Sequence, residues 1–308
     1  MTPPFKRYPL IIRVLLMFSM FMFNMGVISF MASRLAEWLF GIEDTSAILQ
    51  GTLSQPSDVD VFLFIQGLTS IGGFVLTSMM FAVLETGEFK KRLGLTVPVA
   101  FKLIGVTILA IIAAQFFIEF LVSINKLIPL PSSLSFLVEY QKKTEELTNA
   151  MMGFKDIGHL ITTTLVMAVI PAIGEEFFFR GLLLGGLLRG KVNAVFSILL
   201  TGVIFSFSHF EYNNLIAIAA LGSFLGYLYY LSGSLWLPIA AHFTNNFLAV
   251  LLKFLFNVGY ISEDVANSET PIYMTVISMT LFFALIFLLR RWKQPAVFTL
   301  EEETESLS

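Results

Sequence analysis

The sequence lacks cysteine and is poor in charged residues. None of its 308 residues is a cysteine, which excludes disulfide bonds and any chemistry that depends on a thiolate. Only 13% of the residues are Asp, Glu, Lys or Arg, whereas a soluble globular domain has about 25%. The formal net charge of −3 gives no indication of nucleic-acid binding. The composition therefore argues against a soluble domain and predicts no nucleic-acid partner.

Apolar residues dominate instead. They make up 56% of the chain, which includes 33 phenylalanines. Apolar runs of about 18 residues or more recur along its length, and such runs are typical of transmembrane helices. We therefore predict an all-α polytopic membrane protein that has the lipid bilayer as its surroundings. About eight spans are predicted: Pro9–Met31, Val61–Leu84, Pro98–Val122, Ile157–Leu188, Ala194–Phe210, Leu215–Leu231, Leu235–Val258 and Pro271–Arg290.

Basic residues indicate the orientation of these spans. If both termini are on the inner side, ten Lys and Arg residues fall on inner segments and five on outer segments. The inner ten are Lys6, Arg7, Lys90, Lys91, Arg92, Arg189, Lys191, Arg290, Arg291 and Lys293; the outer five are Arg34, Lys126, Lys142, Lys143 and Lys155. This excess favours cytoplasmic termini.

The chain divides into three predicted parts by the motifs that it carries. Residues 1–156 hold N-terminal helices and loops without catalytic motifs. Residues 157–258 hold the polar motifs described below, and residues 259–308 hold the last helix and an acidic cytoplasmic tail. In the first part, the stretch SFLVEYQKKTEELTNAMMGF has mixed charge and is predicted to be an amphipathic helix at the membrane interface.

Three charged residues lie in the fourth predicted span, in the stretch GEEFFFRG. One buried charge at a bilayer centre costs about 2.5–3.5 kcal/mol, so such residues are candidates for function. On an α-helix Glu176 and Arg180 share a face, with the acid before the base, which favours an ion pair. Glu175 points about 100° away from that pair. We interpret the pair as supporting and Glu175 as a general base; the alternative is that all three lock this span to a neighbour.

Two later motifs place histidines in apolar helices. FSFSHF puts Phe205 and His209 on one helix face, and HFTNN puts His242 and Asn246 on one face. Taken singly, each histidine is more often an interhelical hydrogen-bonding residue. Taken with Glu175, these residues from three helices are suited to activating water and binding an oxyanion. They are also suited to binding a metal ion.

Other polar residues in or near the spans have simpler interpretations. His159, near the start of the fourth span, is predicted to be a surface residue. Gln115 and Glu119 share a helix face and are predicted to make a helix-packing hydrogen bond. Arg13 lies near the end of a span, where its side chain can reach the membrane surface.

The chain resembles the CPBP family of intramembrane proteases, which includes the CAAX prenyl endopeptidases and the bacteriocin-processing or Abi proteins. The resemblance rests on three motifs in the family's order, on the fourth, fifth and seventh predicted spans: Glu175-Glu176-x-x-x-Arg180, Phe205-x-x-x-His209 and His242-x-x-x-Asn246. It implies hydrolysis of a peptide bond at the membrane. By this resemblance Glu175 is catalytic and His209 helps it to activate water. His242 and Asn246 would stabilise the oxyanion, while Glu176 and Arg180 support the site.

The resemblance leaves the metal and the substrate open. Glu175, His209 and His242 could hold a zinc ion, but the chain has no HExxH helix and Asn is a poor zinc ligand. We therefore favour a mechanism without a tightly bound metal, with zinc as the alternative cofactor. The expected partner is a peptide or protein substrate, without a prenyl group, at a prokaryotic plasma membrane. Two other functions remain: an ion- or proton-coupled transporter, although the chain shows no inverted repeat, and a non-catalytic immunity or scaffold protein.

Straight helices would keep the two histidines apart. With 1.5 Å rise per residue, His209 would lie about 25 Å from the inner side along its span and His242 about 10 Å. The two can meet only if helices tilt, if the sixth span is short, or if the seventh breaks at Pro238. The fourth predicted span is also too long for one straight crossing, and Gly174 is the predicted place of a break.

Overall fold

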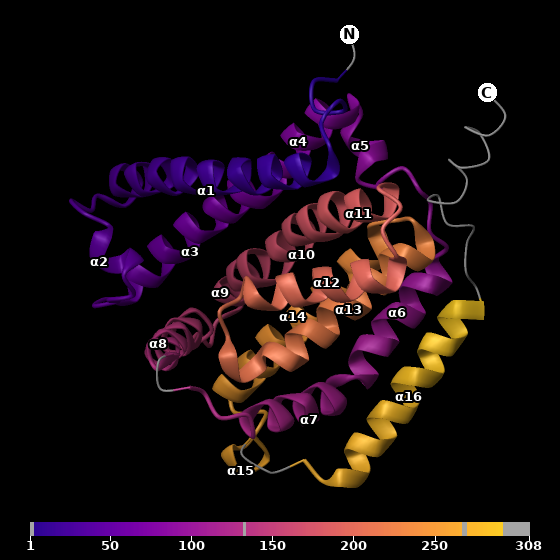
Figure 1. The fold of residues 1–308 in the computed structure, drawn as a ribbon. Helices are drawn as coiled ribbons and strands as arrows, with labels where there is room; N and C mark the ends of the chain where they lie inside the picture. Colours follow the sequence, from indigo (N-terminus) through magenta and orange to yellow (C-terminus); the bar gives the residue numbers. More distant parts are fainter. Residues whose placement is uncertain (1–2, 132–133, 267–269, 292–308) are drawn as a thin grey trace, which may run out of the picture. The chain divides into compact units, whose positions relative to one another are not determined.

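The computed structural model describes residues 3–131, 134–266 and 270–291, and within these ranges the regular structure is entirely helical (Figure 1). Among the described residues, six helical segments are long and apolar enough to cross a membrane: Leu10–Phe40, Pro56–Thr86, Ile157–Arg189, Tyr212–Ser232, Trp236–Asn257 and Ile272–Arg291. The prediction of an all-α polytopic membrane protein is confirmed. The acidic tail, Thr299–Ser308, lies outside the described residues.

The remaining two predicted spans are less regular. Helices α6 (Phe101–Ala113) and α7 (Gln115–Lys126) form a pair bent by 44°, which is a seventh span if the pair is counted as one. Helix α12 (Ala194–Phe207) is apolar but has only 14 residues. At 1.5 Å per residue it is about 21 Å long, shorter than the hydrocarbon core of a typical bilayer. The count of eight spans therefore stays a prediction, and so does the three-part division of the chain.

A side chain from another helix explains the bend between α6 and α7. Ser278, in α16 (Ile272–Arg291), donates a hydrogen bond from Oγ to the carbonyl of Ala113 at 2.5 Å. The same Oγ accepts a bond from the backbone N–H of Phe117 at 3.0 Å. A side chain that replaces the regular i→i−4 bonds is a recognised cause of helix kinks. Ser278 thus satisfies both backbone groups that the bend exposes.

The two neighbouring polar residues, Gln115 and Glu119, bond to different partners. Gln115 donates from Nε2 to the carbonyl of Ile111 at 2.9 Å, within the bent pair. Glu119 accepts a bond from Thr270, just before α16, at 2.5 Å. The expectation of a packing role agrees with the Glu119 contact, because it links α7 to the start of another helix.

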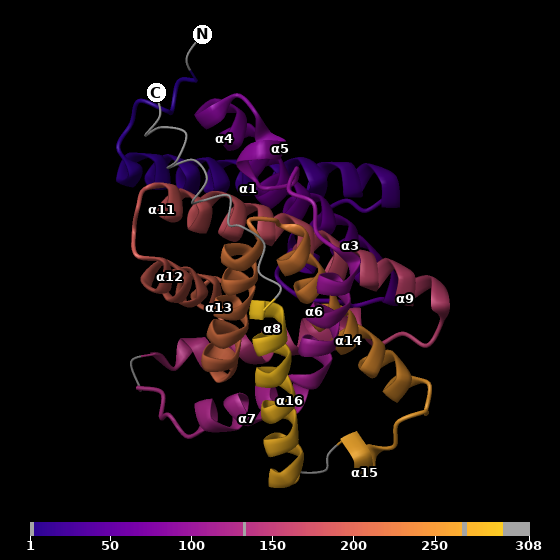
Figure 2. The same cartoon turned by 90° about the vertical axis from the view of Figure 1, so that its right-hand side faces the viewer.

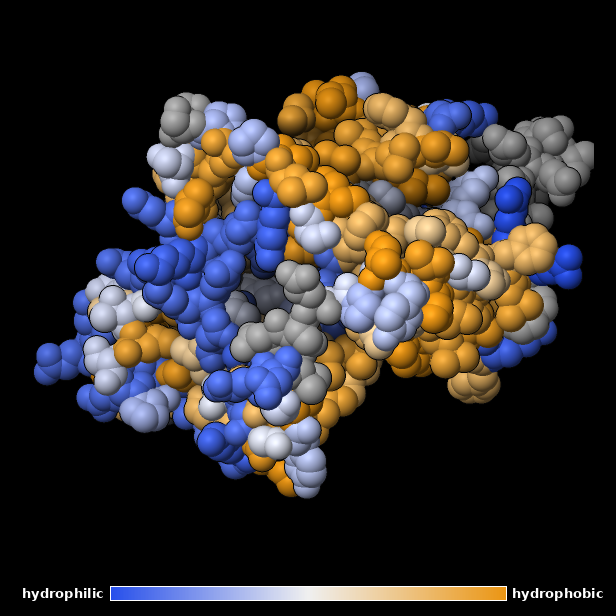
Figure 3. Space-filling model, turned by 90° about the horizontal axis from the view of Figure 1, so that it is seen from below, coloured by the Kyte–Doolittle hydropathy of each residue, from blue (hydrophilic) through white to orange (hydrophobic). Residues whose placement is uncertain are grey.

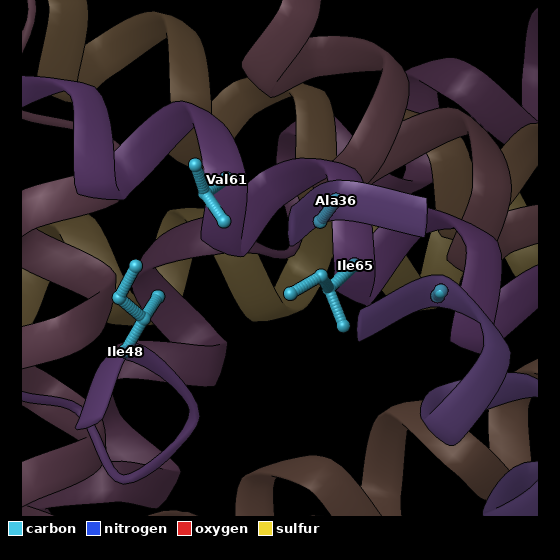
Figure 4. Packing of buried hydrophobic residues seen from close by; sticks show 5 residues of the cluster. Ala36, Ile48, Val61 and Ile65 are labelled. Atoms are coloured by element: carbon cyan, nitrogen blue, oxygen red, sulfur yellow. The ribbon is translucent and has the colours of Figure 1, made fainter. Parts of the chain in front are cut away.

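The described residues form two compact units. The first lies within Met1–Gly87, Lys142–Phe178 and Asn246–Ser268, and the second within Glu88–Gln141, Phe179–Asn245 and Glu269–Ser308. The first unit begins with α1 (Leu10–Phe40), α2 (Ser46–Leu49) and α3 (Pro56–Ser70), which continues through η1 (Ile71–Leu76) into α4 (Thr77–Thr86). Part of its apolar core is formed by Ala36, Ile48, Val61 and Ile65 (Figure 4).

An ion pair joins α1 to the end of α4. Arg13 donates from Nη1 to Glu85 Oε1 at 2.7 Å, and the side chain of Glu85 is almost fully buried. The sequence marked Arg13 only as a residue that can reach the membrane surface, and it gave no role to Glu85. A paired guanidinium needs no route to water, because the carboxylate compensates its charge.

Helix α8 (Phe136–Met151) confirms the helix predicted from SFLVEYQKKTEELTNAMMGF. After it, α9 (Ile157–Thr164) is capped by Asp156, whose side chain accepts a bond from the backbone N–H of His159 at 3.0 Å. His159 is also held by its ring. It lies 2.5 Å from Asp156 and 3.3 Å from Asp60, and stacks on Phe154. The predicted surface histidine is therefore about one-third exposed and packed on three sides.

The cap at Asp156 predicts a dependence of stability on pH. Hydrogen bonds from the His159 backbone and side chain hold the pKa of Asp156 below its ordinary value of 3.8. A carboxyl group whose pKa is lowered by folding stabilises the protein above its unfolded pKa, and loses that contribution as pH falls through its folded pKa. We therefore expect Asp156→Ala to lower the melting temperature at neutral pH, and we expect the difference from wild type to shrink below its ordinary pKa. The measurement is a thermal-shift series at neutral pH and below pH 3.8. Equal differences in melting temperature between variant and wild type under the two conditions would contradict this expectation.

The second unit contains α5 (Phe89–Arg92), α6, α7, α11 (Gly185–Arg189), α12, η5 (Tyr212–Asn214), α13 (Leu215–Ser232) and α16. In it α12 and α13 lie side by side, as Figures 1 and 2 show. The contact is very close at Gly202 and Gly222, where a Cβ on Gly222 would lie 3.1 Å from the Gly202 Cα. Small residues permit such close approach between helices in membranes.

Large apolar side chains remain exposed on many of these helices, and Figure 3 shows broad hydrophobic areas on one face. Examples from several helices are Phe23, Phe30, Phe101, Phe196, Phe207 and Phe287. In water such surfaces would favour aggregation, whereas in a bilayer they contact lipid tails. The protein is accordingly an integral membrane protein.

Candidate active site

The fourth predicted span is one continuous helical segment, Ile157–Arg189, without a break at Gly174. Its irregularity takes another form, because the helix widens twice into π-helical turns. In order, its parts are α9, η3 (Leu165–Val169), α10 (Ile170–Glu175), η4 (Glu176–Leu184) and α11. π-Helical turns bond i→i+5 and are frequent at functional sites. The angle of about 100° between Glu175 and the Glu176–Arg180 pair was derived for an ideal α-helix. That geometry does not apply from Glu176 onward, where η4 begins.

Two arginines hold the carbonyl groups of η4. Arg92 donates to Gly181 O at 2.6 Å and to Leu182 O at 3.3 Å, and Arg189 donates to Gly181 O at 3.4 Å. Arg189 also donates to the carbonyl of Arg92 at 3.2 Å. The prediction of orientation counted both arginines among the basic residues of the inner segments. Arg92 is in fact buried, and its guanidinium bonds to helix carbonyls. It is therefore a weaker indicator of orientation than a basic residue on an exposed loop.

Arg180 is buried and makes two contacts that its spacing from Glu176 did not predict. Its Nη2 donates to the carbonyl of Gly222, in α13, at 2.8 Å. Its guanidinium lies 4.5 Å from the centre of the Phe205 ring, in a cation–π contact. Arg180 therefore links η4 to α13 and to the Phe205 side chain of α12.

His209 lies just after α12, and its ring is oriented by the backbone. Its Nδ1 is 2.8 Å from the carbonyl oxygen of Phe205. A carbonyl only accepts hydrogen bonds, so Nδ1 is the nitrogen that donates in this bond. The next residue, Phe210, has φ of 55°, a left-handed backbone that is rare for an aromatic residue and reverses the chain direction.

The ring of Phe205 brings the two histidines together. The His209 ring lies 4.6 Å from it and the His242 ring 5.8 Å, both edge to face. The two histidine rings thus lie beside one residue, a meeting that was expected only with tilted helices, a short sixth span or a break at Pro238. No break is seen at Pro238, which lies in the first turn of α14 (Trp236–Asn257), where proline is tolerated.

The other predicted site residues belong to the first unit. Glu175 ends α10 and Glu176 begins η4, where it is buried. Asn246 follows His242 by one turn of α14, and its Nδ2 donates to Met167 O at 3.3 Å. Arg180, His209 and His242 belong to the second unit.

Comparison with known proteins points to the same segment. Residues 157–248 match the family model described as Type II CAAX prenyl endopeptidase Rce1-like, and this range contains all three motifs. This match supports the resemblance of the segment to the CPBP family. A protein of Bacillus subtilis (strain 168) named "Putative membrane peptidase YdiL" is 32% identical over 89 residues. That stretch is 29% of this chain and 36% of the relative, so the chain covers little more than a third of the relative's length. No solved structure gives a significant match.

The bacterial source of this relative agrees with the predicted prokaryotic plasma membrane. A residue outside the matched range 157–248 also makes hydrogen bonds to it. Arg92, which bonds to two carbonyls of η4, precedes the matched range by more than 60 residues. Sequence reasoning missed this role because a backbone carbonyl acceptor is present at every position and leaves no mark in residue identity.

Proposed function

We propose that the chain is an intramembrane endopeptidase that hydrolyses a peptide bond near the membrane surface. The observation that carries the proposal is the cluster around Phe205. His209, just after α12, His242, in α14, and the buried Arg180 all lie beside this ring. This cluster lies within the residues that match the CPBP family. The substrate is proposed to be a peptide or membrane protein without a prenyl group.

In the proposed mechanism Glu175 is the general base that takes a proton from water. His209 is proposed to assist it, and the bond between its Nδ1 and the Phe205 carbonyl holds the ring in one orientation. The hydroxide attacks the peptide carbonyl carbon and forms a C–O bond, which gives a tetrahedral oxyanion. When this oxyanion collapses, the C–N bond breaks and the proton held by Glu175 passes to the leaving amine. These steps balance without an added cofactor.

His242 and Asn246 are proposed to stabilise the tetrahedral oxyanion by donating hydrogen bonds to it. Their spacing of four residues in α14 places both side chains on one helix face. Glu176 and Arg180 are proposed as supporting residues, and the bond from Arg180 to Gly222 supports that role for the arginine.

We propose no step through a metal ion. In the part of the chain that the structure describes, no three His, Cys, Asp or Glu side chains form a group that could hold one. Glu175, His209 and His242, the set considered for zinc, would supply the three protein ligands of a catalytic zinc site. The donor set thus suits zinc, which stays the alternative cofactor.

Replacing Asn246 tests the proposed oxyanion site. We expect Asn246→Ala to lower kcat of peptide cleavage by about 10²–10³-fold, the usual effect of removing one oxyanion donor, with KM little changed. Purified protein in detergent would be incubated with a defined peptide mixture, and products quantified by mass spectrometry. The matched control is Asn245→Ala, which removes the same side chain one residue away. Equal losses in the two variants would refute the assignment.

A further inference from the structure

The turn that carries His209 is held by side chains from outside the segment that matches the CPBP family. This turn, residues 208–216, runs from the end of α12 into the first turn of α13. Asn125, near the end of α7, donates from Nδ2 to the carbonyl of Tyr212 at 2.7 Å. Its Oδ1 accepts a bond from the backbone N–H of Ile216 at 2.9 Å. One side chain thus holds two points of the turn.

Asn125 is buried, so the loss of these two hydrogen bonds would be costly. Asn125 is only 2% exposed, so its amide has little access to water as an alternative partner. The N–H of Ile216 lies in the first turn of α13, where a helix has no backbone acceptor for its own N–H groups. Removal of the amide would leave both the Tyr212 carbonyl and the Ile216 N–H without these partners.

A second side chain holds the same turn from α8. Gln141 is 5% exposed, and its Oε1 accepts a bond from the backbone N–H of Asn213 at 3.1 Å. Next to it, the Tyr140 ring packs edge to face on Phe210, the residue with the left-handed backbone, at 5.9 Å. An unfavourable backbone conformation persists only where its surroundings hold it in place. These contacts supply that restraint directly after His209.

We propose that Asn125, assisted by Gln141, is a positioning residue for His209. Asn125 acts through the backbone of the turn and does not contact the His209 ring. The bond from Nδ1 to Phe205 sets the direction of the ring, whereas the turn sets where the ring stands. The expected loss of kcat rests on the proposed function. The position of the His209 ring can be tested without any measurement of activity.

The test replaces Asn125 with Asp, which has the same shape. A carboxylate accepts from Ile216 but cannot donate to Tyr212, whereas a protonated carboxyl group restores one donor and one acceptor. At neutral pH we expect kcat to fall by about 100-fold with KM little changed, since a displacement of about 1 Å costs that much. As pH is lowered, the ratio of variant to wild-type kcat should recover.

Nuclear magnetic resonance of the imidazole nitrogens supplies a readout that does not need activity. The chain has only three histidines, so selective ¹⁵N labelling gives three assignable rings. In Asn125→Asp the signals of His209 should move and those of His159 should stay. The matched control is Asn257→Asp, in the first unit, whose amide also donates to two backbone carbonyls, those of Met152 and Phe154. It should leave the His209 signals unchanged.

Gln141→Leu provides a second variant if Asn125→Asp does not fold. It removes the acceptor for Asn213 without adding charge, and should move the His209 signals in the same direction with a smaller loss of kcat. Unchanged His209 signals in the folded variants would overturn the proposal. If the wild-type chain cleaves no peptide, the proposed function fails, but the imidazole signals still decide whether Asn125 positions His209.

Discussion

Glu175→Gln should lower kcat of peptide cleavage by about 10²–10⁴-fold, the contribution of a positioned general base, with KM little changed. Glutamine has the shape of glutamate but cannot take a proton from water. The measurement is a progress curve for the best-cleaved peptide, with enzyme in detergent, compared with wild type over a range of pH. Thermal unfolding of both proteins shows whether the fold is kept.

Glu119→Gln is the matched control for this variant. It makes the same change in a membrane helix, at a side chain that bonds to Thr270, and it should leave kcat unchanged. Retained proteolysis in Glu175→Gln would disprove the mechanism. Proton or solute flux in vesicles that disappears in the same variant, without cleavage by wild type, would favour a transporter. A zinc chelator added to the wild-type reaction should leave the rate unchanged, and a loss restored by zinc would show that a metal is required.

Gly202→Ala should destabilise the protein by about 1–3 kcal/mol, the usual cost of overpacking a close contact. A Cβ at Gly202 would lie 2.8 Å from the Ser223 backbone nitrogen and 2.9 Å from the Ala219 carbonyl oxygen, and closer still to Ser223 Oγ. Backbone atoms cannot move aside as a side chain can. Helix α12 would have to move away from α13, and Phe205 lies one turn further along α12.

Gly105→Ala is the matched control, because it makes the same substitution at a site where it should raise stability and not lower it. Gly105 lies in α6, and a Cβ there would meet no atom within 4 Å. Alanine favours a helix interior over glycine by up to about 1 kcal/mol, so this variant should be slightly more stable than wild type. Thermal unfolding in the same detergent compares the two. Shifts of the same sign and size would show that the contact between α12 and α13 does not limit the residue at position 202.

The positions of the helices were largely predictable. The predicted span Ile157–Leu188 corresponds to the observed Ile157–Arg189, and Leu215–Leu231 to α13, which ends at Ser232. Hydropathy is a local property, so a long apolar run marks a helix without knowledge of its neighbours. The first helix was underestimated, since α1 continues to Phe40 and ends only at Gly41, which adopts a left-handed backbone at φ 67°.

The candidate site was predictable only as a set of residues. Spacing placed His242 and Asn246 on one face of a helix and singled out the acidic pair, because helical periodicity is also local. It did not predict the π-helical turns or the bend between α6 and α7, where donors from elsewhere in the chain bond to the helix backbone. Arg92 bonds to carbonyls about 90 residues later, and Ser278 enters a bend more than 160 residues earlier.

The sequence by itself determined the membrane class, the approximate spans and the motif residues. Only the tertiary structure decided that His209, His242 and Arg180 meet at the Phe205 ring, and that Asn125 holds the turn after His209. The physical reason is the nature of the partners. Apolar runs and helical faces are encoded by residue type along the chain, whereas aromatic packing and bonds to backbone carbonyls depend on which segments fold together.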